Sequence, residues 1–161
     1  MFNLFKKNKK NEDLTETVSA ISQFLVSDEG SGFPTPYKEF LDSTKLDYSL
    51  ESLGYVEFYL DEIRKKQKEL NDEQFTKIIL RCGSYLGEVL RRNFNKNSYW
   101  INYDTAISID PAIKNYAKSA PVSYILFTEP NTFTFPLAKI VKIIEETQKD
   151  GLSSFVLVLK N

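Results

Sequence analysis

The residues best suited to chemistry lie near the end of a long helical pattern. Glu88 is followed three and four positions later by Arg91 and Arg92, a spacing that places all three side chains on one face of a helix. A carboxylate beside two guanidinium groups could orient a polar ligand. The alternative is a structural ion pair at a helix edge. We therefore treat the three residues as candidate binding residues.

An aromatic cluster follows. Tyr99, Trp100, Tyr103 and Asp104 lie in a segment rich in aromatic and β-branched residues, which is typical of a strand. Alternation along a strand predicts Tyr99 and Tyr103 on one face and Trp100 on the other. One set would then be core and the other exposed, and tyrosine and tryptophan anchor protein interfaces. Sheet packing by all of them is the alternative.

The missing residue types exclude several chemistries. The chain has no histidine and one cysteine, Cys82. Catalytic triads, Cys-His pairs, histidine-bound metals, intrachain disulfides and multi-cysteine zinc sites are therefore excluded. No calcium loop, phosphate-binding loop or dinucleotide fingerprint occurs. We expect no cofactor, no metal and no catalytic residue, and Cys82 falls on an apolar helical stripe, as a core residue does.

Charge is distributed unevenly along the chain. The first ten residues hold four lysines and no acid, whereas the rest holds 17 basic and 22 acidic residues within a total charge of −1. The acidic body disfavours nucleic acid and favours a basic protein partner. No apolar run is long enough to span a membrane. The N-terminus also lacks the apolar core of a secretory signal, so we expect a cytoplasmic protein.

The N-terminal half predicts helices. Residues 1–12 are expected to be a basic flexible tail, followed by one domain over residues 13–161. Helices are predicted from about Leu14 to Val26, and from near Leu50 with Asp47 or Ser49 as its cap. The clearest helix begins after Asn71 and continues for some 20 residues.

The C-terminal half predicts a small sheet. Strands are expected over residues 98–103 and 122–128, and residues 132–135 should pair back as a hairpin. Pro136 suits the first position of a helix, and residues 152–159 fit either a strand or a helix. The fold class is α+β: N-terminal helices, a long central helix packed on an antiparallel sheet of about three strands, and a C-terminal helix.

Two glycines interrupt the central helix. Gly83 and Gly87 lie four apart, and each costs about 1 kcal/mol relative to alanine inside a helix. Close approach of another helix or a strand would compensate for that cost.

A longer pattern contains these glycines. The run from Gly83 to Arg92 (GSYLGEVLRR), then Trp100, then the run from Phe135 to Lys142 (FPLAKIVK) resembles small uncharacterised bacterial α+β domains. The resemblance covers the C-terminal half. It implies an α+β fold with a long helix packed on the sheet, and it supplies no catalytic residue.

Three functional hypotheses remain. The first is a non-enzymatic cytoplasmic domain that binds a protein, in a specific form an immunity-type protein that neutralises a basic toxin. The second is a small-molecule or ion-binding domain, or an enzyme, that uses Glu88, Arg91 and Asp104 in a cleft. The third is a structural subunit that homodimerises through an aromatic sheet face, so the chain is expected to be a monomer or a homodimer.

Overall fold

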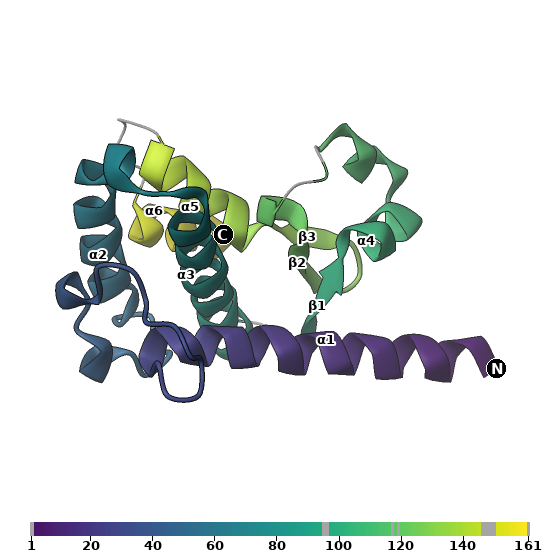
Figure 1. Cartoon of the computed structure of the whole chain (residues 1–161). Coiled ribbons are helices and arrows are strands. Elements are labelled where there is room, and N and C mark those ends of the chain that lie inside the picture. The colour runs from purple at the N-terminus through teal and green to yellow at the C-terminus, as the bar shows by residue number, and fades with distance from the viewer. Residues whose placement is uncertain (1, 95–96, 117, 119, 146–150, 161) are drawn as a thin grey trace.

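Helices form most of the molecule, and a small sheet lies beside the long central helix (Figure 1). The computed structural model describes residues 2–94, 97–116, 118, 120–145 and 151–160, with side chains from Leu14 onward except at 120 and 160. Its helices are α1 (Phe2–Val26), α2 (Leu53–Lys65), α3 (Asp72–Asn93), α4 (Tyr103–Ile109), α5 (Pro136–Glu145) and α6 (Leu152–Lys160). Its strands are β1 (Ser98–Asn102), β2 (Tyr124–Thr128) and β3 (Thr132–Thr134). The predicted α+β class, with a long central helix, is confirmed.

Short 3-10 helices fill the connections. They are η1 (Lys38–Phe40), η2 (Ser43–Lys45), η3 (Gln67–Glu69), η4 (Pro111–Asn115) and η5 (Ala120–Val122). None of the described helices is both long and apolar enough to cross a lipid bilayer.

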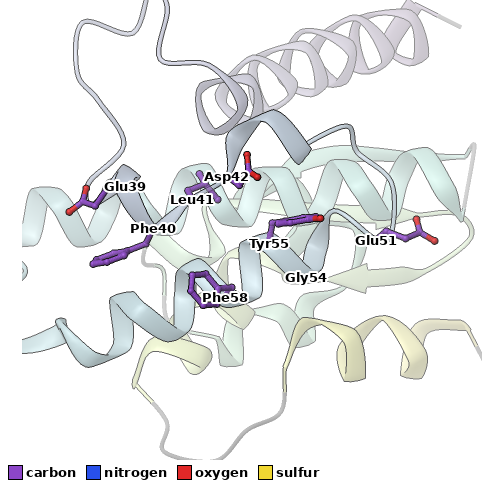
Figure 2. A pocket seen from close by; sticks show the side chains of 8 residues that line it. All are labelled: Glu39, Phe40, Leu41, Asp42, Glu51, Gly54, Tyr55 and Phe58. Atoms are coloured by element: carbon purple, nitrogen blue, oxygen red, sulfur yellow. The ribbon is translucent and has the colours of Figure 1, made fainter.

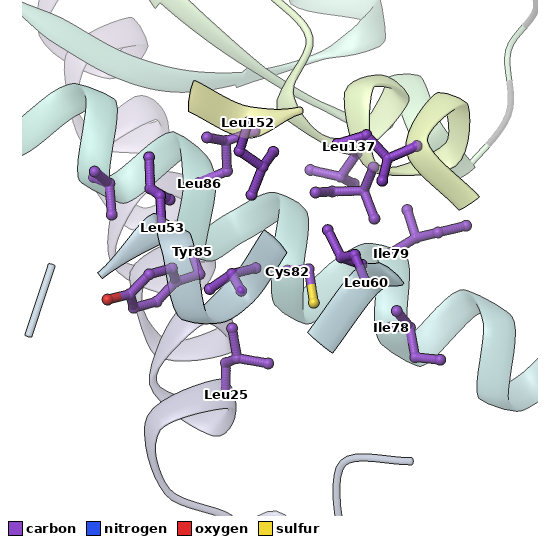
Figure 3. Close-up of a cluster of buried hydrophobic side chains, with 14 of the residues drawn as sticks. Leu25, Leu53, Leu60, Ile78, Ile79, Cys82, Tyr85, Leu86, Leu137 and Leu152 are labelled. Atoms are coloured by element: carbon purple, nitrogen blue, oxygen red, sulfur yellow. The ribbon is translucent and has the colours of Figure 1, made fainter. Parts of the chain in front are cut away.

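The central helix α3 follows from local sequence. The Asn71 side chain accepts a hydrogen bond from the Gln74 amide, and the Gln74 side chain accepts one from the Asn71 amide. This reciprocal cap satisfies two amides that a helix start leaves without partners. The α3 residues Ile78, Cys82 and Leu86 are fully buried, and Figure 3 shows them among side chains of the neighbouring helices.

The sheet is antiparallel, with strand order β1-β2-β3. Trp100 pairs with Leu126 and faces the helical core, while Ile101 pairs with Ile125 and faces a smaller cluster around α4 and η4. The alternation of a strand thus divides the core into two parts. The predicted hairpin is confirmed, because Phe133 pairs with Phe127.

Several element boundaries differ from the predictions, among them the start of β2, which is Tyr124 rather than residue 122 because residues 120–122 form η5. Helix α1 begins at Phe2, so helix continues through most of the predicted basic tail. Helix α2 begins at Leu53 rather than near Leu50, because Asp47 and Ser49 accept hydrogen bonds from amides of the preceding turn. Strand β1 ends at Asn102, whose side chain caps α4 by accepting from Thr105 N.

The segment that periodicity left open, residues 152–159, belongs to helix α6. Leu152 and Val156, four residues apart, are both buried in the helical core. Packing on neighbouring helices selects the helix, since the apolar run alone suits either structure.

Candidate functional site

Glu88 lies inside the molecule. Its residue is 0 % exposed. Arg91 donates to both carboxylate oxygens, from Nε to Oε1 at 2.9 Å and from Nη2 to Oε2 at 2.9 Å. Arg92 Nε donates to Oε2 at 3.1 Å. The indole N–H of Trp100 donates to Oε1 at 2.9 Å.

Two glycines near Glu88 allow the neighbouring elements to pack closely around it. A side chain at Gly87 would collide with the Trp100 ring, and one at Gly83 would lie 2.7 Å from Cγ of Leu137 on α5. The predicted reason for the two glycines, close approach of a strand and of a helix, is therefore confirmed. Gly87 lets Trp100 reach α3, and Glu88 on the next position accepts its N–H.

The electrostatics of Glu88 favour its charged form. Burial alone would raise the pKa of Glu88, but hydrogen bonds from Arg91 and Trp100, with the charges of Arg91 and Arg92, hold that pKa below its ordinary value. Both oxygens are already occupied by donors, and no surface reaches them. The cluster can stabilise the contact between helix and sheet, but Glu88 cannot contact a substrate without breaking it.

The aromatic candidates divide between the core and the far side of the sheet. Trp100 is fully buried against α3. The Tyr99 ring packs edge-on against Phe127, with centroids 5.5 Å apart. Tyr103 is not on the strand face that alternation predicted, because it begins α4, and its hydroxyl donates to the Tyr116 carbonyl at 2.8 Å.

Asp104 is not brought together with Glu88. The Asp104 side chain is 77 % exposed and pairs with Lys118 at 3.4 Å, whereas Glu88, on α3, is buried and accepts a hydrogen bond from Trp100. The cleft of two carboxylates that the second hypothesis needs is not formed by these residues.

Neither a metal site nor a reactive thiol is found among the described residues. Among the described residues, no group of three acidic or cysteine side chains is arranged to hold a metal ion. Cys82 is fully buried, and burial raises the pKa of its thiol. A thiol kept protonated in an apolar core is a poor nucleophile.

The sequence did not reveal an open groove over α2, which Figure 2 shows. Its volume is about 690 Å³, and it is lined by Glu39, Phe40, Leu41, Asp42, Glu51, Gly54, Tyr55 and Phe58. We call this surface the α2 groove. Tyr55 is 41 % exposed and Phe58 is 58 % exposed, which is high for large apolar side chains.

Two elements create the α2 groove. Helix α2 buries Val56, Leu60 and Ile63 in the helical core, so Tyr55 and Phe58 lie outside its buried stripe. The segment containing η1 lies alongside, and the Tyr59 hydroxyl ties it to α2 by donating to the Pro36 carbonyl at 2.6 Å. The signal in the sequence was the pair of aromatic residues outside the apolar stripe.

The rim of the α2 groove is acidic. Glu39, Asp42 and Glu51 supply three carboxylates, and Figure 2 shows them at separate points around the aromatic rings. None of the three forms an ion pair within the part of the chain that the structure describes. Asp42 accepts a hydrogen bond from the Thr44 hydroxyl. The groove thus combines exposed apolar rings with uncompensated negative charge.

Comparisons of the chain with protein-family models, with curated proteins and with solved structures find no match.

Proposed function

We propose that this chain is a non-enzymatic domain that binds another protein through the α2 groove. The observation that supports the proposal most is the exposure of Tyr55 and Phe58 within one groove. Aromatic side chains of this kind supply much of the binding energy at protein interfaces, because they bury a large area with few rotatable bonds.

The chemistry of the groove favours a protein over other ligands. The carboxylates of Glu39, Asp42 and Glu51 would repel the phosphates of a nucleic acid. A small molecule is generally held in a cavity that encloses most of its surface, whereas the α2 groove is open along the side of a helix (Figure 2). A protein surface can cover such a groove and exclude water from its rings.

The net charge of the chain after its first ten residues favours a partner of opposite charge. Outside the first ten residues the chain has 17 basic and 22 acidic residues, so complementary charge favours a basic protein. The specific form of the proposal is an immunity-type protein that neutralises a basic toxin in the cytoplasm. This form of the proposal rests on a general analogy, because many proteins that block a toxin are small acidic domains.

The test places a photo-crosslinking phenylalanine analogue at Phe58 in the full chain, expressed in its native cell. The matched control carries the analogue at Phe33, which is exposed to a similar extent, 62 % against 58 %, but does not line the groove. We expect one protein to be captured from position 58 and not from position 33.

A second measurement makes the capture specific. The captured protein, purified, should bind Tyr55→Ala and Phe58→Ala variants about 30-fold more weakly than the unaltered chain, as expected for residues at the centre of an interface. The Phe33→Ala variant should bind normally. Capture from both positions alike, or affinities that the groove substitutions leave unchanged, would refute the proposal.

A further inference from the structure

One glycine of the chain has no structural reason to be a glycine. Gly54 lies in the first turn of α2, its φ is not left-handed, and a Cβ built there would meet no atom within 4 Å. Alanine is the better helix former at such a position. The fold therefore has space for a side chain at residue 54 and does not use it.

The other glycines differ from Gly54 in conformation or in surroundings. Gly30 and Gly32 occupy left-handed backbone conformations, and a Cβ at Gly83 or Gly87 would collide with packed side chains of other elements. A Cβ at Gly151 would meet the carboxylate of Glu57, the end of a flexible side chain. Gly54 has neither a left-handed backbone nor an atom near its Cβ position, and it also lines the α2 groove.

The neighbours of Gly54 form the walls of the groove. Tyr55 follows Gly54 on α2, and Phe58 is four residues after it, on the next turn of the same helix. Glu51 lies three residues before Gly54, in the turn that precedes the helix. Figure 2 shows Gly54 between the Glu51 carboxylate and the two rings. The missing side chain lowers the floor of the groove and brings its backbone within reach of an occupant.

The charge around Gly54 favours a positively charged group in the groove. Three rim carboxylates, Glu39, Asp42 and Glu51, have no ion-pair partner among the described residues. A cation beside aromatic rings is attracted to their faces, and a guanidinium group also stacks on them. Carboxylates then accept its N–H groups in charge-assisted hydrogen bonds.

From this arrangement we infer that the groove receives a positively charged side chain of the protein partner, an arginine or lysine, directly above Gly54. Its aliphatic part packs on Tyr55 and Phe58, and its cationic end lies among the rim carboxylates. This inference rests on the proposed function and deepens it, because it names the group that the groove recognises.

The test uses three short blocked peptides of equal length, in which arginine, glutamine or glutamate is flanked by leucine and alanine. Each is titrated into the full-length chain while backbone amide resonances are followed by NMR. We expect the arginine peptide to shift the signals of Gly54, Tyr55 and Phe58. It should bind at least about tenfold more tightly than the glutamine peptide, with an affinity that falls as salt is added. The glutamate peptide should not bind.

Two glycine variants separate recognition from folding. Gly54→Leu fills the floor of the groove, so it should leave the melting temperature unchanged or raise it while weakening the arginine peptide at least about tenfold. Gly30→Leu is the matched control, because its Cβ also meets no atom but its φ of 77° is left-handed. That variant should lower the melting temperature and bind the peptide normally.

Several outcomes would overturn the inference. Equal binding of the glutamine and arginine peptides would show that the groove does not recognise a cationic side chain. Normal binding of the arginine peptide to Gly54→Leu would show that the side chain does not lie at Gly54. Groove signals that shift with protein concentration alone would show that a second copy of the chain fills the site. If the arginine peptide fails but a captured partner still depends on Phe58, the inference is wrong and the proposed function stands. If neither occurs, both are wrong.

Discussion

Replacing Glu88 by alanine should lower the unfolding free energy of the protein strongly, because the role of this residue is structural. The substitution removes a fully buried carboxylate that accepts hydrogen bonds from Arg91, Arg92 and Trp100. The Trp100 indole N–H would stay buried without an acceptor, which costs about 1–3 kcal/mol.

The two arginines reduce the cost of that substitution. Their side chains are 28 % and 35 % exposed, so water can solvate them once the carboxylate is gone, and losing each pair adds at most about 1 kcal/mol. The total is about 3 kcal/mol, at the low end for removing one partner of a buried ion pair. For a chain of this size, this corresponds to a fall in melting temperature of roughly 6–12 °C.

The assay is urea unfolding followed by fluorescence of Trp100, the only tryptophan in the chain. Glu88→Gln should lose only about 1 kcal/mol, because its amide oxygen can still accept from the indole. The control is Glu69→Ala, which removes an exposed pair with Lys66 at 3.5 Å and should change the unfolding free energy by less than about 0.5 kcal/mol. A loss below about 1 kcal/mol for Glu88→Ala would refute the structural role assigned to the cluster.

Three further predictions concern the core and its charges. Gly83→Ala should lower the unfolding free energy by about 1–3 kcal/mol, because the added Cβ would lie 2.7 Å from Leu137 Cγ; an unchanged urea midpoint would contradict the close approach. The pKa values of Glu88 and Asp28 are lowered in the folded chain, so the unfolded chain binds more protons in acid and stability should fall as pH drops below about 4.5, less steeply in Glu88→Gln. Cys82 is fully buried and should react with a thiol reagent only as fast as the chain opens, so labelling within seconds in native buffer would show that its burial is wrong.

Local patterns predicted the elements that depend on near neighbours. The cap at Asn71 and the apolar stripe of α3 are set within a few residues of the chain, and both are found. The same is true of Pro136, which begins α5, and of the hairpin that pairs β2 with β3. The boundaries of α2 and β1 were less accurate, since Ser49 and Asn102 cap turns whose position the pattern does not reveal.

The candidate site could be predicted only in part. The spacing of Glu88, Arg91 and Arg92 correctly placed the three side chains together, and it also allowed both a ligand site and an ion pair. The indole of Trp100 completes the cluster from a different element. The Trp100 ring can approach because Gly87 has no side chain in its way. The spacing of residues along the helix does not predict which residue of another element packs there.

The sequence by itself determined the fold class, the acidic body and the absence of histidine chemistry, because composition and short-range periodicity depend on nothing beyond the chain. Only the tertiary structure decided which polar groups are enclosed and which aromatic rings are exposed. Glu88 is buried because the Trp100 ring of β1 reaches α3. Tyr55 and Phe58 line a groove because the segment around η1 lies beside α2. Burial and exposure are properties of surfaces that meet across long stretches of chain, so they are settled when the helices and the sheet pack together.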